Sequence, residues 1–128
     1  MDAKVKYWVE LAEYDLETAE VMLTAKRYLY VGFMCHQSIE KILKAAICNN
    51  SDTYPPKIHN LQRLARIANV FSQLSAEQKT FIAQLEPLNI QARYPEYKDE
   101  LFKSLQGKYS KLLLTNTREL FQWILQTL

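Results

Sequence analysis

The sequence predicts an all-α protein, an up-and-down bundle of about five helices, of which three are long and two short. Apolar residues recur three and four positions apart over long stretches, which is the spacing of one helix face. No stretch alternates apolar and polar residues as strands do, so a sheet is not expected. The chain has two glycines and four prolines, and the prolines all lie between residues 55 and 95. Both ends are therefore free of strong breakers, which favours long helices there.

Length and composition indicate one soluble domain over residues 1–128. A chain of 128 residues is long enough to bury a core and too short for two ordinary domains. Hydrophobic residues make up 48% and charged residues 23%, as in ordinary globular proteins. No apolar run reaches about 18 residues, and the charged N-terminus holds no apolar run of signal length. We therefore expect no membrane segment and a cytoplasmic location.

The net charge of +2 is too small to indicate nucleic-acid binding by itself, so contact with RNA is permitted but not implied. Cys35 and Cys48 lie thirteen residues apart on one expected helix. At the helical rise this separation is roughly 20 Å, which is too far for a disulfide. Both are expected to be reduced core cysteines.

Local signals set the expected element boundaries. Asn60 is expected to cap the third helix, and Ser75 with Gln78 to form a capping box before the fourth. Residues 89 to about 100 are expected to form an irregular link, because Pro95 lacks an amide proton and disfavours a helical residue before it. The expected helices run from Ala3 to about Lys26, from about Tyr28 to about Asn49, from Leu61 to about Val70, after Ser75 through Leu88, and from about Gly107 to Leu128.

The second expected helix has an apolar arc that covers nearly half its circumference, too wide for a helix resting on one neighbour. It is expected either to be central to the bundle or to line an oligomer interface. The last helix is expected to turn inward a stripe that includes Tyr109. The arc of the second helix contains Phe33, Cys35, Ile39, Ile42, Leu43, Ala46 and Ile47, and the stripe of the last contains Tyr109, Leu113, Leu120, Ile124 and Leu128.

Polar residues form an expected seam beside this arc. His36 and Glu40 fall at its margin one turn apart, while Gln37, Lys41 and Lys44 fall beyond it. Glu40 and Lys44 can form an i,i+4 ion pair, and His36 can donate to Glu40. A structural seam is the favoured interpretation. The functional alternative makes His36 a general base or a ligand, but one histidine and one carboxylate do not make a metal site without further ligands, and we expect neither a metal nor a cofactor.

Asp15 falls in the apolar stripe of the first helix, where a carboxylate must be paired or hydrogen-bonded. Its expected partner is Lys41, Lys44 or His36. If it lined an open cleft instead, it would be a candidate acid or base.

The sequence resembles the HEPN domain family. The resemblance spans about residues 5 to 125 and implies a helical bundle that forms homodimers. Many relatives are encoded beside a minimal nucleotidyltransferase and act with it as toxin and antitoxin, and the family name refers to a proposed nucleotide-binding role. The residues that carry the resemblance are Trp8, Ala12, Asp15, Leu16 and Ala19, then Phe33, His36, Gln37, Glu40, Lys41 and Lys44, then His59, Leu61 and Leu64, and finally Ala92, Arg93, Tyr94 and Pro95.

Ribonucleases of this family carry an arginine, four to six intervening residues and a histidine, and this motif is absent here. No histidine follows Arg93 within range, and neither His36 nor His59 has an arginine five to seven places before it. Lys98 is a poor substitute, because a lysine has an ordinary pKa of about 10.4. The resemblance therefore implies a bundle without the usual ribonuclease centre.

Arg93, Tyr94 and Tyr97 occupy that place, and a guanidinium beside two phenols can hold a phosphate and stack a base. The alternative is that Tyr94 packs the loop while Arg93 pairs with an acidic neighbour, Glu96 or Asp99. His59 is expected to be a helix-entry residue. Its functional alternative is an Arg-His pair with Arg93, assembled from different elements.

These residues are compatible with three functions. The leading hypothesis is a homodimeric binding or partner module that associates with a minimal nucleotidyltransferase and binds a nucleotide or RNA phosphate near Arg93. The rival is a metal-independent ribonuclease with a divergent centre built from Arg93, His59 and either Lys98 or Tyr97. The third is a non-catalytic scaffold that dimerises through the apolar face of the second helix.

Overall fold

A computed structural model of the chain describes residues 1–91, 99–100 and 103–128, and for residues 90 and 91 the backbone alone. The described residues contain five α-helices, one short 3-10 helix, further helical residues at 99–100 and 103–104, and no strand. This confirms the all-α fold predicted from the periodicity. The elements are α1 (Ala3–Thr24), α2 (Tyr28–Asn50), α3 (Leu61–Ile67), the 3-10 helix η1 (Phe71–Gln73), α4 (Ala76–Gln91) and α6 (Gly107–Gln126).

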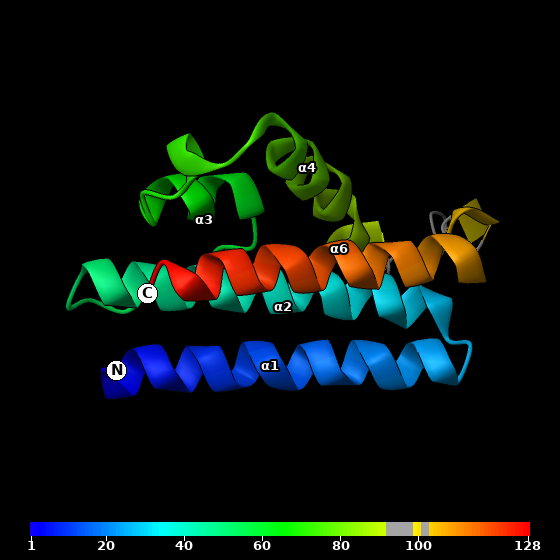
Figure 1. Ribbon diagram of the computed structural model, residues 1–128, viewed down its shortest axis with the longest axis horizontal. Helices are drawn as coiled ribbons and strands as arrows, with labels where there is room; N and C mark the ends of the chain where they lie inside the picture. Colours follow the sequence, from blue (N-terminus) through cyan, green and yellow to red (C-terminus); the bar gives the residue numbers. More distant parts are fainter. Residues whose placement is uncertain (92–98, 101–102) are drawn as a thin grey trace.

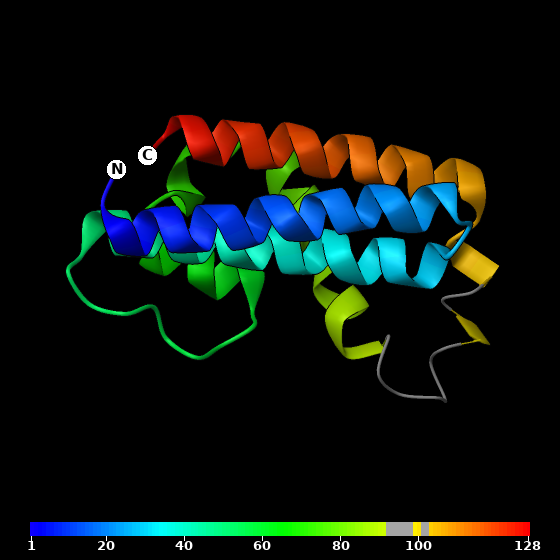
Figure 2. The same cartoon turned by 90° about the horizontal axis from the view of Figure 1, so that it is seen from below.

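The helices form layers around α2 (Figure 1). Helix α1 runs antiparallel to α2 along one side, and α3, η1 and α4 cover the opposite side. Helix α6 lies along α2 and runs in the same direction, because α3 and α4 carry the chain back to the end at which α6 begins (Figures 1 and 2). Both chain termini lie at the other end of the bundle.

Helix α2 is the central element, since it contacts α1, α3, α4 and α6. Its apolar arc is covered by these helices, and Ile39 and Ile42 are completely buried. Of the two roles expected for this arc, the structure selects the central one. The prediction that this face of α2 could form a dimer interface is wrong, because helices of the same chain already cover the face.

The predicted caps are confirmed. The Arg63 backbone amide donates to the Asn60 side chain at 2.9 Å. Ser75 and Gln78 form the reciprocal capping box, with donor–acceptor distances of 2.8 and 3.0 Å.

Two helix ends differ from prediction. Helix α3 ends at Ile67 rather than near Val70, because Asn69 adopts a left-handed conformation (φ 62°) that closes the helix. Helix α4 extends to Gln91, so residues 89–91 are not the start of an irregular link, and residues 99 and 100 are also helical. The helical pattern of α4 continues through residues 89–91 because a proline removes only its own amide and leaves those of earlier residues free to bond.

The inward face of α6 also differs from prediction at its first turn, where Tyr109 is 41% exposed and Ser110 is completely buried. Ser110 holds this position because it continues the buried row that Leu113, Leu114 and Thr117 extend. Leu120 and Ile124 are buried as predicted.

The two cysteines are free and buried, as predicted. Burial raises the pKa of the Cys35 thiol to about 12, and a hydrogen bond with Thr117 offsets this only in part. The pKa of Cys48 is also raised, again chiefly by desolvation.

Within the described residues, no helix is both long enough and apolar enough to cross a membrane.

Replacing Ile39 with aspartate should abolish folding rather than association, because a carboxylate would enter a completely buried position without a partner. We expect loss of the cooperative helical transition in a circular-dichroism melt. Leu112→Asp is the matched control, since Leu112 lies on α6 with 56% of its surface exposed and should melt close to the wild type. A cooperative, near-wild-type melt of I39D would contradict the central position of α2.

Candidate functional site

A buried carboxylate, that of Glu40, organises the main polar cluster of the molecule. Its side chain is only 4% exposed. Lys44 Nζ donates to Oε2 at 3.1 Å, and His59 Nδ1 lies 3.0 Å from Oε1. His36 Nδ1 lies 4.0 Å from the same Oε1 and 3.3 Å from the side-chain oxygen of Gln37. One carboxylate therefore gathers two imidazoles and an ammonium.

The local sequence explains this geometry. His36, Glu40 and Lys44 are spaced four apart, so they follow one another along a single stripe of α2. His59 arrives from the segment before α3, where the cap at Asn60 fixes the start of the helix.

The depth of this stripe was not predicted. His36 is completely buried and Lys44 is 6% exposed, whereas the sequence placed His36 at the margin of the apolar arc and Lys44 beyond it. The stripe is covered from two sides. The Lys44 ammonium lies 5.5 Å from the ring centroid of Trp8 on α1, and His59 covers Glu40. The predicted Glu40–Lys44 pair is confirmed, but it lies within the core.

Burial makes this pair costly to break. A charge removed from water loses hydration worth several kcal/mol, which the opposite charge and hydrogen bonds must offset. The Trp8 ring contributes a cation–π contact to the Lys44 side of the pair. The cluster thus joins α1, α2 and the segment before α3. Each charged group in it can be buried because its partners offset the hydration that it loses.

A second polar contact joins α1 to α2. Lys41 Nζ donates to Asp15 Oδ2 at 2.5 Å, with the Asp15 side chain 10% exposed. Lys41 is one of the three partners predicted for Asp15, and the pairing is confirmed. Nearby, the Ser38 hydroxyl donates to the backbone oxygen of Ala12 at 2.9 Å. This pairing supports the structural interpretation of Asp15 over an acid or base in a cleft.

Glu86, which holds α3 against α4, is not among the residues predicted from the sequence. Its Oε1 accepts from the Gln62 backbone amide at 2.9 Å. Partial burial raises the pKa of Glu86, amides at Leu61 and Gln62 lower it in part, and the nearby Glu40 carboxylate adds to the rise. The one available signal was an acidic residue directly after Leu85 on the inner face of α4.

His59 is the member of the cluster that reaches solvent, with its side chain 57% exposed. The ionised Glu40 favours the tautomer that carries a proton on Nδ1, which leaves Nε2 as the acceptor in the neutral ring. An imidazole fixed in this way can bind an anion when protonated or exchange a proton when neutral. His36 has no such exposure, and its place in the core favours the structural interpretation.

Arg93, Tyr94 and Tyr97, like Lys98, lie outside the described residues. Their role as ligand-binding residues, and the approach of His59 to Arg93, therefore stay predictions. Within the described part of the chain, no group of three or more His, Cys, Asp or Glu side chains is arranged to hold a metal ion.

Fold and cluster together define an all-α bundle whose central helix carries charged groups buried against its neighbours. The family model of the HEPN domain matches residues 5–127. The chain therefore belongs to the HEPN domain family. No curated protein and no solved structure matches the sequence.

Replacing Glu40 with glutamine should lower the free energy of unfolding by about 3 kcal/mol or more, because the Lys44 charge would stay buried without its carboxylate. Chemical denaturation followed by circular dichroism measures the change. Adding Lys44→Met should restore part of the loss, since the uncompensated charge is then removed. Glu10→Gln is the control: its pair with Lys6 is solvent-exposed, and its removal should change stability little. Equal effects of E40Q and E10Q would refute the role of the buried cluster.

Proposed function

We propose that the chain is a HEPN-type binding and partner module that forms a homodimer, associates with a minimal nucleotidyltransferase and binds a nucleotide or RNA phosphate near Arg93. The observation that carries the proposal is the match of the HEPN model to residues 5–127. In the sequence, a guanidinium and two phenols at Arg93, Tyr94 and Tyr97 stand where ribonucleases of the family carry an arginine and a histidine. These groups suit binding a phosphate and a base rather than moving protons at neutral pH.

Binding is favoured over cleavage by the positions of the two histidines. His36 is completely buried beside Glu40, so an RNA strand has no access to its ring. His59 is exposed, but it has no arginine at the family's spacing.

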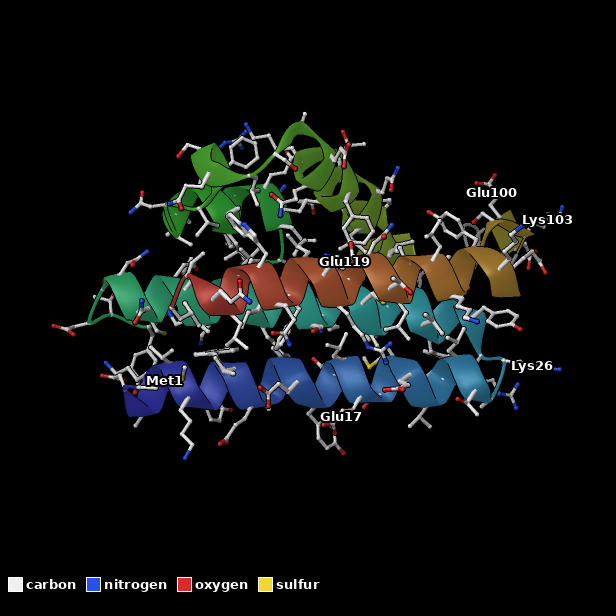
Figure 3. The ribbon with its side chains drawn as sticks, viewed as in Figure 1. Met1, Glu17, Lys26, Glu100, Lys103 and Glu119 are labelled. Atoms are coloured by element: carbon white, nitrogen blue, oxygen red, sulfur yellow. The ribbon has the colours of Figure 1, made fainter. Side chains whose placement is uncertain are left out.

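The homodimer is supported by an apolar stripe on the outer face of α1. Tyr14 and Val21 lie seven residues apart on α1 and are 69% and 59% exposed. Glu17 lies on the side of α1 that is turned away from α2 (Figure 3), and Tyr14, three residues before it on the helix, shares this side. Exposed apolar groups in a row are typical of a contact surface.

Replacing Arg93 with alanine should weaken binding of a 12-nucleotide single-stranded RNA by about tenfold or more, because one charge-assisted phosphate contact is lost. Arg63→Ala removes the same charge from an exposed position on α3 and serves as the control for net charge. Fluorescence anisotropy at fixed salt measures both affinities.

The proposal is wrong if the purified protein stays monomeric in light scattering and neither nucleotides nor RNA shift its melting temperature. It is also wrong in its binding site if R93A and R63A weaken RNA binding equally.

One observation favours the rival function, a ribonuclease: the exposed His59 ring is oriented by Glu40 at 3.0 Å. A carboxylate that fixes an imidazole in this way is a common arrangement in acid–base catalysis. Under this hypothesis the imidazole would act with Arg93 on an RNA phosphate.

The rival hypothesis predicts that His59→Gln, which keeps an N–H donor for Glu40 but removes proton transfer, lowers RNA cleavage about 100-fold or more. Arg93→Ala should lower it as well. Cleavage of a labelled RNA is measured for both variants and the wild type, with melting curves to show that each folds. If both variants cleave at the wild-type rate, this centre is eliminated.

A further inference from the structure

We propose that a hollow at the N-terminal end of α1 binds a nucleobase together with its phosphate. The hollow has a volume of about 410 Å³ and is lined by Ala3, Lys4, Tyr7, Trp8 and Tyr54. It is formed where the segment between α2 and α3 meets α1, at the end of the helix that carries Met1 (Figure 3). The contacts of the hollow point to a planar aromatic anion. Only the choice of a nucleotide among such ligands rests on the proposed function.

Three aromatic rings make this hollow suited to a flat ligand. The Tyr7 and Trp8 rings lie 5.5 Å apart at an angle of 85°. A planar ring can therefore lie flat on one of them and meet the other edge-on, which are the two favourable aromatic geometries. Tyr54 is 76% exposed, so most of its ring surface is accessible to a ligand for stacking. Successive bases of single-stranded nucleic acids stack on such rings.

Lys4 supplies the charge. Its Nζ donates to the backbone oxygen of Asp52 at 2.7 Å and lies 5.0 Å from the Tyr54 ring centroid. These contacts hold the ammonium at the hollow, and a lysine carries three N–H donors, of which the Asp52 bond takes one. An anionic substituent on a stacked ring can accept from the others.

The lining residues distinguish this hollow from a larger one, of about 640 Å³, between α4 and α6. The larger hollow has aromatic groups too, Phe81 and Trp123, but Glu77 and Glu119 also line it. Two carboxylates repel a phosphate. The residues that line the hollow at α1 include a lysine and no carboxylate, so its chemistry fits an aromatic anion.

Trp8 makes the proposal directly measurable. In a Trp123→Phe background, Trp8 is the remaining tryptophan of the chain. We expect adenosine monophosphate to change its fluorescence saturably, adenosine to bind more weakly, and inorganic phosphate alone to cause no change. Tyr54→Ala should raise the Kd for adenosine monophosphate about tenfold. Lys4→Gln should raise it as well, while leaving the Kd for adenosine unchanged.

Tyr30→Ala is the matched control, because Tyr30 is 48% exposed at the start of α2 and does not line the hollow. Absence of a saturable change with adenosine monophosphate overturns the proposal, and so do equal effects of Y54A and Y30A. A dodecamer of adenylate that binds more tightly than the monophosphate identifies an RNA strand as the source of the base, and equal affinities identify the free nucleotide. Arg93→Ala should leave this fluorescence change intact, so failure here and failure of phosphate binding near Arg93 are separately visible.

Discussion

The fold depends on the burial of most of α2 among four other helices. A side chain that these helices cover cannot reach water, so a charge there must find its partner inside the protein. Glu40 meets this constraint by accepting from Lys44 and His59, and Lys41 meets it through Asp15 of α1. The positions of α1 and of the segment before α3 are therefore tied to the charges of the central helix as well as to its apolar residues.

The prediction from sequence succeeded where the determining contacts are local. The caps at Asn60 and Ser75 depend on residues three positions away, and the i,i+4 pair of Glu40 and Lys44 depends on one helix turn. The sequence predicted three possible partners for Asp15, because the apolar stripe of the first helix, which contains Asp15, had to face the second helix. These features need no knowledge of the tertiary arrangement.

Prediction failed where distant segments decide the environment. Lys44 was placed outside the apolar arc because its position on α2 alone says nothing about Trp8, which covers it from α1. Glu86 was missed because its partners are backbone amides of α3, which carry no signal in the sequence. The hollow at α1 was not predicted, because Tyr54 belongs to a segment some forty-seven positions away from Tyr7 and Trp8 in the sequence. The ligand-binding role of Arg93, Tyr94 and Tyr97 stays a prediction.

The two cysteines have a practical consequence. Cys35 is held as a protonated thiol in the core, and Cys48 is buried near the end of α2. The thiolate is the nucleophile that attacks a thiol-directed reagent, so burial and a raised pKa slow the reaction of both natural cysteines in the folded protein. A single cysteine introduced on an exposed helix face would then take a spin label or fluorophore much faster than either natural cysteine. Distances between labelled copies can thus be measured by spectroscopy without first removing the natural thiols.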